Sequence, residues 1–121
     1  MNPIEASRII ADEYSTKILI ATHLRPKNAV ELSQNLSIPI AACYRRINTL
    51  EKLGLLVCVG RSLTQKGKRI RNYLSQLKDA SIFLEEGQLK VRFNMKTGRE
   101  INFGGPWTPL RGVAPSESAS Q

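Results

Sequence analysis

The chain has 121 residues, of which 18 are Lys or Arg and 10 are Asp or Glu, so its formal net charge is +8 at pH 7. This length allows one domain with a modest core, and no apolar run reaches the ~18–20 residues of a membrane-spanning helix. The positive excess favours a polyanionic partner, either nucleic acid or an anionic membrane face. The N-terminal sequence MNPIEASRIIADEY has early acidic residues and no long apolar run, so we expect no signal peptide.

Capping residues predict the first two helices. Residues 2–5, Asn-Pro-Ile-Glu, combine a helix cap, a proline at the first helical position and a glutamate that completes a capping box. Ser15 and Thr16 are expected to cap a second helix from Lys17 to Leu24, and Ile18 and Leu24 belong to its apolar face.

The next two helices are predicted in the same way. Residues 28–31, Asn-Ala-Val-Glu, repeat the capping box and open a short helix to about Leu36, with Val30 and Leu32 as core candidates. A turn over 37–39 leads to a helix from Ile40 to Leu53. The spacing of this helix places three apolar residues, Cys43, Ile47 and Leu50, on one face, and Gly54 ends it.

The region after Gly54 is harder to assign. Leu55 to Val59 has the composition of a buried strand, and the stretch between Val59 and Leu63 looks too short for a long wing. Residues 65–78 place four apolar residues at helical spacing, Ile70, Tyr73, Leu74 and Leu77. We favour a helix there, and an extended wing is the alternative.

From residue 80 onward the apolar period changes to two. Residues 80–103 predict a β-hairpin that turns near Glu86 and Gly87, followed by a second turn at 96–99 into a strand from Glu100 to Phe103. The Gly-, Pro- and Ser-rich segment 104–121 predicts a disordered tail. We therefore divide the chain into a domain over 1–79, a hairpin extension over 80–103 and a tail over 104–121.

This order of elements predicts an α+β fold, a winged helix-turn-helix with a C-terminal β-hairpin. The helix over 40–53 would be its recognition helix, because a short preceding helix braces it and leaves its outer side free for a major groove. At ~100° per residue, the side opposite the core carries Ala41, Arg45, Asn48 and Lys52. Nine basic residues and one acidic residue, Glu51, lie between Arg45 and Lys78, so the charge is concentrated here.

The candidate DNA contacts differ in character. We favour a DNA contact for Arg45 over an ordinary solvated position. Arg46 lies at the edge of the core, where it either packs its stem or contacts a phosphate. Tyr44 could meet a phosphate or pack in the fold. Ala41 and Ala42 offer methyl contact with thymine, or allow close approach without contact. Phosphate contacts are expected from three residues of the basic run, Arg61, Lys66 and Lys68.

Three segments resemble archaeal-type winged-helix regulators related to the ArsR and MarR families. They read DEYSTKILIATHL, AVELSQNLSIPIAACYRRINTLEKLGLL and LTQKG, and they cover about Ile10 to Lys68. The resemblance implies a sequence-specific, usually dimeric transcriptional regulator. The family's DNA-contacting positions fall on Ala41, Ala42, Tyr44, Arg45 and Arg46. The two alanines replace the Ser-Thr pair that is common in the family, which removes two hydroxyl donors.

Metal and catalytic sites are not expected. Cys43 and Cys58 have no paired spacing and, like His23, are better explained as core or helix-end residues, so we predict no metal site and no cofactor. Unpaired cysteines also favour a reducing, cytoplasmic location. The chain has one histidine and no Gly-rich phosphate loop, and Glu85 and Glu86 fit a hairpin turn better than a catalytic pair. We predict that it is not an enzyme.

The sequence therefore predicts a homodimeric regulator that binds double-stranded DNA, with no membrane partner and an effector that the sequence does not indicate. Two alternatives stay open: a nonspecific architectural or nucleoid DNA-binding protein, and a winged-helix module that binds another protein. The dimer surface is expected to combine the N-terminal helix, around Ile4 to Tyr14, with residues 68–77 and the hairpin after them. The competing interpretation is that the apolar residues of this helix only cover the core.

Overall fold

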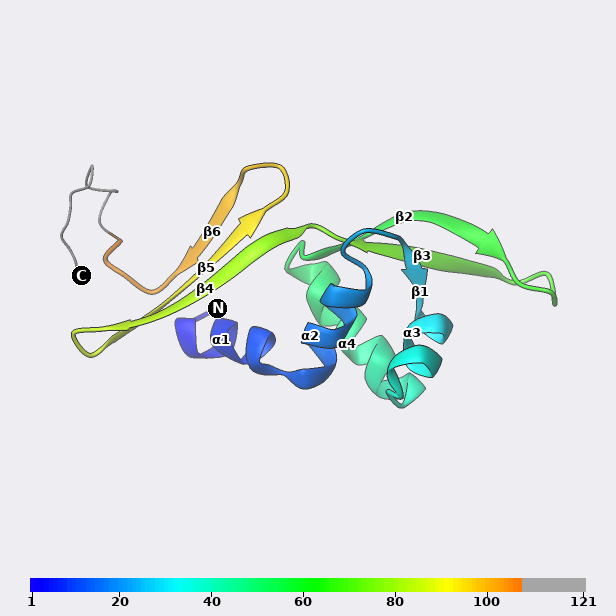
Figure 1. Ribbon diagram of the computed structural model, residues 1–121, viewed down its shortest axis with the longest axis horizontal. Coiled ribbons are helices and arrows are strands. Elements are labelled where there is room, and N and C mark those ends of the chain that lie inside the picture. The colour runs from blue at the N-terminus through cyan, green and yellow to red at the C-terminus, as the bar shows by residue number, and fades with distance from the viewer. Residues whose placement is uncertain (108–121) are drawn as a thin grey trace.

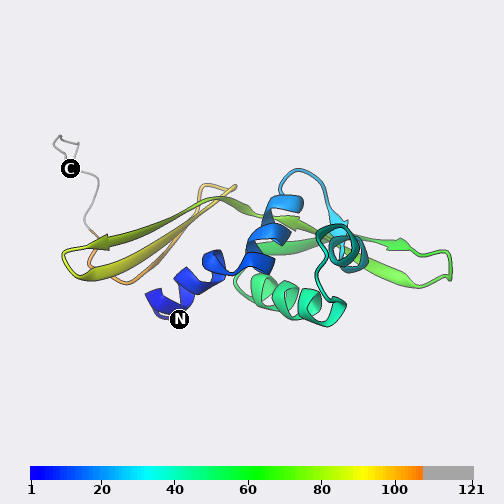
Figure 2. The same ribbon diagram turned by 60° about the horizontal axis from the view of Figure 1, so that its bottom comes forward.

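The computed structural model describes residues 1–107, which fold into four helices and six strands in an α+β arrangement (Figure 1). In chain order the elements are α1 (Pro3–Ala11), α2 (Glu13–Ala21), β1 (Lys27–Asn28), α3 (Ala29–Leu36), α4 (Ile40–Lys52), β2 (Leu56–Leu63), β3 (Arg69–Ser75), β4 (Leu77–Glu85), β5 (Gln88–Met95) and β6 (Glu100–Phe103). The strands form two three-stranded sheets, ordered β1-β3-β2 and β4-β5-β6. Only Gln76 separates β3 from β4, and the helices lie on one side of the long band that these strands form (Figures 1 and 2).

The predicted cap of α1 is confirmed, whereas that of α2 is wrong. Asn2 and Glu5 form a capping box, in which the Glu5 N–H donates to Asn2 Oδ1 at 2.8 Å. Asp12, directly after α1, caps α2 by accepting from the Ser15 N–H at 2.9 Å, so α2 begins at Glu13. It also ends early, at Ala21, and Leu24 is 83% exposed rather than part of the core.

The predicted capping box of α3 and the buried face of α4 are confirmed. The Glu31 N–H donates to Asn28 Oδ1 at 2.8 Å. The face of α4 that carries Cys43, Ile47 and Leu50 is fully buried. The core assignment of Val30 is wrong, because this side chain is 40% exposed on the outer side of α3.

Residues 69–75 form a strand rather than part of a helix. β3 pairs with β2 from Leu56↔Ser75 to Leu63↔Arg69, so the two strands make a long hairpin. The helical spacing of the apolar residues was misleading. The backbone hydrogen bonds of β3 are made with β2 on one side and with the two residues of β1 on the other, and this pairing favours a strand. β2 itself is less buried than expected. Leu56 is buried, while Val57 and Val59 are 39% and 50% exposed.

The C-terminal hairpin and its second turn are confirmed. β4 and β5 pair from Leu77↔Met95 to Glu85↔Gln88, and β5 pairs with β6. The prediction that the disordered tail begins at residue 104 is wrong for Trp107, which packs edge-on against Phe83 with ring centroids 5.9 Å apart. The rest of the predicted tail, 108–121, lies outside the described residues.

One core joins the two sheets. Buried side chains of α2 and α4, such as Ile18 and Ile47, belong to the same apolar cluster as Val91 and Phe93 of β5. Backbone bonds also connect the sheets, because the Gln76 N–H donates to the Leu55 carbonyl and the Gln76 carbonyl accepts from the Lys96 N–H, each at 2.8 Å.

Candidate nucleic-acid interface

A short turn holds α3 and α4 together. Ser37 adopts a left-handed conformation with φ 55° and ends α3. The next residue, Ile38, is 2% exposed, and its N–H donates to the Ser33 carbonyl at 3.0 Å. The Cys43 thiol donates to the Ala29 carbonyl at 3.6 Å, which links the first turn of α4 to the start of α3. The orientation of α4 is therefore set by buried contacts with α3.

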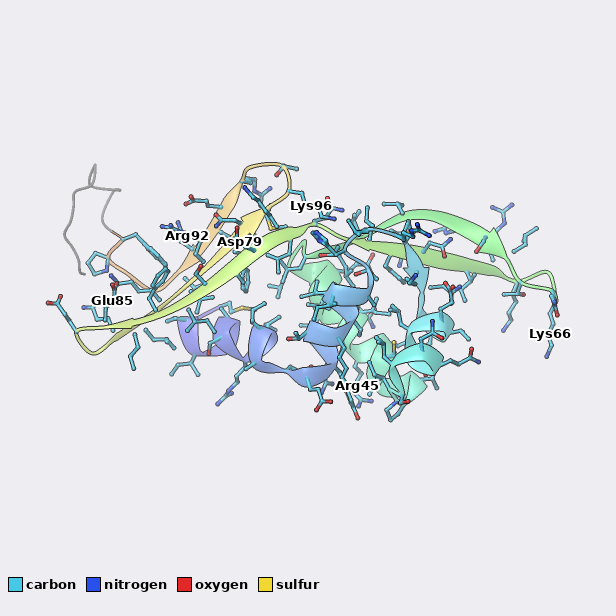
Figure 3. The ribbon with its side chains drawn as sticks, in the orientation of Figure 1. Arg45, Lys66, Asp79, Glu85, Arg92 and Lys96 are labelled. Carbon is cyan, nitrogen blue, oxygen red and sulfur yellow. The ribbon has the colours of Figure 1, made fainter. Side chains whose placement is uncertain are left out.

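One side of α4 is open to solvent along its length. It is formed by five of the predicted site residues, Ala41, Tyr44, Arg45, Asn48 and Lys52. Among residues 1–107, the Arg45 guanidinium forms no ion pair, and Figure 3 shows this side chain on the underside of the helices. An unpaired, exposed guanidinium is available for a bidentate contact with guanine or phosphate. This surface therefore offers hydrogen-bonding groups on a rigid helix.

Ala42 does not belong to this surface. It is 6% exposed and lies in the core, so the predicted methyl contact with a nucleic acid is wrong. The reason is helical geometry, because one step of ~100° from the exposed Ala41 turns the next side chain into the core. Tyr44, in contrast, is 44% exposed and lies beside Arg45 on the open side.

Arg46 is engaged within the protein. Its Nε donates to Asp12 Oδ2 at 2.8 Å and its Nη2 to Asp12 Oδ1 at 3.2 Å. The guanidinium also lies 5.5 Å from the centre of the Tyr14 ring. Arg46 thus connects α4 to the junction between α1 and α2, and it could bind a phosphate only by giving up or sharing this pair.

The Asp12–Arg46 pair changes the acidity of both groups. The hydrogen bond from Arg46 lowers the pKa of the Asp12 carboxyl from 3.8 to about 2, and the bond from the Ser15 N–H acts in the same direction against partial burial. The same pair raises the pKa of Arg46. Asp12 therefore stays ionised at neutral pH, where it both caps α2 and holds the arginine.

The β2–β3 hairpin carries the second group of predicted contacts. Arg61, Lys66 and Lys68 are all exposed, and Lys66 lies at the far tip of the hairpin (Figure 3). The tip is closed by the Thr64 N–H, which donates to the Lys68 carbonyl at 2.8 Å. Gly67 supplies the required left-handed conformation with φ 79°. The positive charge that the sequence concentrates here is thus held on an extended arm.

One further contact, not predicted from the sequence, fixes this hairpin against α4. Arg71 Nη2 donates to Glu51 Oε2 at 2.8 Å, and the guanidinium lies 5.4 Å from the centre of the Tyr73 ring. The only signal in the sequence was the single acidic residue within the basic run. In the structure Glu51 ties the last turn of α4 to the middle of β3, where Arg71 is opposite Arg61, so the two basic elements keep a fixed relation.

Within residues 1–107, no group of three or more Cys, His, Asp or Glu side chains could hold a metal ion. Cys43 is buried, which raises the pKa of its thiol, and Cys58 lies apart from it on β2. No described helix is long and apolar enough to cross a membrane.

No family model matches this chain, and no curated protein matches it in sequence.

Proposed function

We propose that this chain is a winged helix-turn-helix protein that binds double-stranded DNA and regulates transcription. In this proposal α4 is the recognition helix, and the β2–β3 hairpin is the wing. The observation that carries it is the open side of α4, where Arg45, Asn48 and Lys52 extend from a helix fixed by its buried face. A major groove admits one helix, Arg pairs with guanine, and Asn pairs with adenine.

The charge distribution supports the same proposal. Lys66 at the tip of the hairpin is separated along the arm from Arg45 on α4, as expected for a phosphate contact that flanks a base-reading helix (Figure 3). Lys68 is exposed two residues further along the chain. The Glu51–Arg71 pair would hold both elements in one orientation on the duplex. The chain would act by binding alone, without a catalytic residue or a cofactor.

One recognition helix contacts only a few base pairs, so we include a homodimer on a two-fold DNA site in the proposal. Each copy would place its α4 in one half-site. Of the N-terminal residues expected in the dimer surface, Ile9 and Ile10 of α1 and Tyr14 of α2 pack against the core, and Ile4 is more than half exposed. This favours the interpretation that these side chains mainly cover the core.

The test is selection of bound sequences from a random pool of double-stranded DNA with the full-length protein. We expect a discrete motif, and an affinity for it that falls steeply as salt rises. Uniform recovery of all sequences with the same salt dependence would favour a nonspecific architectural protein. An absence of salt-sensitive binding to any duplex would overturn the proposal and favour a protein-binding module.

A further inference from the structure

Strand β4 has an apolar face that the other described residues, within 1–107, leave uncovered. The helices lie on the side of sheet β4-β5-β6 where β5 contributes Val91 and Phe93, which are both fully buried. On the neighbouring strand β4, Ile82 is opposite Val91 in the sheet but is 46% exposed, and Leu84 is 75% exposed. Among the described residues β4 pairs only with β5, so its other edge has no strand partner.

A groove continues this uncovered face toward the helices. It has a volume of about 470 Å³ and lies between α1, α2 and the start of β4. Its walls are largely apolar, with Ile10, Leu19, Ile20, Leu77 and Ala80, and Lys78 adds one charge. Ile20 is 71% exposed beside the groove. Contiguous exposed apolar surface of this kind, bordered by polar groups, is typical of a protein interface.

We propose that this surface, which we call the β4 face (Ile20, Leu77, Ala80, Ile82 and Leu84), binds a second copy of the same chain. A two-fold axis would pair the two β4 strands antiparallel through their open edges. The strands would then form one continuous six-stranded sheet, and the apolar side chains of each copy would cover the groove of the other. Such an isologous contact is closed, because it leaves neither β4 edge available for further association.

The distribution of charge and size along β4 favours a second copy as the occupant. A basic residue, Lys78, stands near the start of the strand, Glu85 is its last residue, and Glu86 follows in the turn with φ 50°. With the axis at Ile82, antiparallel pairing brings Lys78 close to the partner's Glu86, just past the end of the partner's strand, and it does so twice. The same register places the small Ala80 opposite the partner's Leu84. Opposite charges across a strand pair are stabilising.

The other side of the strand is compatible with this register. On that side, Asp79 of one copy would lie opposite Glu85 of the other copy. Each of these carboxylates already has a partner in its own sheet. Asp79 Oδ1 accepts from Asn94 Nδ2 at 2.6 Å, and Glu85 Oε1 lies 3.6 Å from Lys90 Nζ. These contacts reduce the repulsion that the two carboxylates would otherwise cause.

The β4 face lies away from the proposed DNA-binding surface. The two hairpins extend to opposite ends of the molecule, with Lys66 at one end and Glu85 at the other, and Arg45 lies between them on the underside (Figure 3). A dimer formed through β4 would leave both copies of α4 accessible. The regulatory meaning of this dimer rests on the proposed function, but dimerisation itself is measured without DNA.

The experiment is sedimentation velocity of the full-length protein without DNA, over a series of micromolar concentrations. We expect a dimer whose dissociation constant rises on the order of a hundredfold in Leu84→Glu, because a charge would enter an apolar contact twice per dimer. The matched control is Leu63→Glu, since Leu63 is 70% exposed on the other hairpin and should leave the dimer unchanged. Circular dichroism would check that each variant folds.

A charge exchange tests the two-fold register. Lys78→Glu should weaken the dimer, and the double variant Lys78→Glu with Glu86→Lys should restore it, because the opposite charges would again face each other. A wild-type monomer, or a dimer unaffected by Leu84→Glu, would overturn the assignment of the β4 face. A dimer that Leu84→Glu disrupts but the double exchange fails to restore would overturn the register. None of these results depends on whether the protein binds DNA.

Discussion

Arg45 and Arg46 are adjacent in the chain but have different surroundings. Arg45 extends from the open side of α4, while Arg46 is held by Asp12 over the Tyr14 ring. The difference follows from one helical step of ~100°, which turns Arg46 toward the junction of α1 and α2. Arg45 is therefore the residue suited to reading a base, and Arg46 is suited to positioning the helix that carries it.

We expect Arg45→Ala to reduce discrimination between the selected DNA site and a scrambled one by about 1–3 kcal/mol, the worth of a bidentate arginine–guanine contact. The fold should be unchanged, because the side chain makes no ion pair with the described residues. Competition binding with the two duplexes measures the loss. Arg99→Ala, in the exposed β5–β6 turn, removes the same charge and should leave discrimination unchanged. Equal effects of the two substitutions would assign Arg45 a purely electrostatic role.

The Asp12–Arg46 pair predicts a pH-dependent contribution to stability. The pKa of Asp12 is about 2 in the folded chain against an ordinary value of 3.8, and the hydrogen bond from Arg46 is the largest cause of the difference. Because the folded value is the lower one, the stabilisation is present above pH ~4 and is lost as the pH falls toward 2. With allowance for solvent screening it amounts to about 1–2 kcal/mol.

Asp12→Asn separates this effect from helix capping, since asparagine is an equally good cap. Urea denaturation at pH 7 should show Asp12→Asn to be less stable than the wild type, and the difference should shrink as the pH approaches 2. A difference that is constant with pH would contradict the assignment of the pKa shift to Arg46.

Among the helices and strands, capping residues close in sequence were sufficient to predict two of the helices. The strands depend instead on pairing between segments that are distant in the chain. Asn2 and Asn28 cap their helices through residues three positions away, so the sequence is sufficient to locate them. β3 depends on β2 and on β1, and β1 lies more than forty residues earlier in the chain. The spacing of Ile70 and Tyr73 fits a helix, but it carries no information on those partners. The open side of α4 was predictable, while the Glu51–Arg71 contact required the fold.

Gly54 connects α4 to β2 and adopts φ +77°, a conformation that L side chains rarely adopt. No atom lies within 4 Å of where its Cβ would stand, so the effect of a substitution is conformational rather than steric. We expect Gly54→Ala to lower the free energy of unfolding by about 1 kcal/mol, measured by urea denaturation. Gly60 has equally open surroundings and no left-handed φ, so Gly60→Ala is the matched control and should be close to neutral. Equal losses in the two variants would contradict this explanation.

The exposed Lys66 at the tip of the β2–β3 hairpin should contribute to the salt dependence of DNA affinity. Lys66→Ala should weaken binding to all duplexes alike and flatten the slope of log affinity against log salt by ~0.9, the value for one lost phosphate contact. Binding titrations at several salt concentrations measure the slope. Lys96→Ala is the control, because Lys96 lies on the upper side of the molecule, opposite Arg45 (Figure 3). An unchanged slope in Lys66→Ala would exclude a phosphate contact at the tip.

For the whole molecule, the long band of β3 and β4 separates the two surfaces to which we assign proposed functions. One hairpin extends toward the proposed DNA contacts, and the other carries the β4 face (Figure 1). The sequence predicted the alternation of β4 and β5, but it could not show which apolar residues stay exposed. Val91 and Ile82 fit the same alternating pattern, and only the placement of the helices leaves one buried and the other accessible.

The combination of the two surfaces predicts how affinity depends on the DNA site. If the β4 face joins two copies with both α4 helices on the same side of the duplex, affinity should be highest when two half-sites are separated by whole helical turns of about 10 base pairs. Adding half a turn would place the second half-site on the opposite side and should reduce affinity to that of a single half-site. Electrophoretic mobility shifts with spacer variants of the selected motif measure this dependence on spacing.

Leu84→Glu should abolish the preference for spacing while its affinity for one half-site stays unchanged, because Leu84 is 75% exposed and remote from α4. A loss of half-site affinity in this variant would show that the β4 face contributes to DNA binding directly, and an unaltered spacing preference would show that another surface joins the two copies.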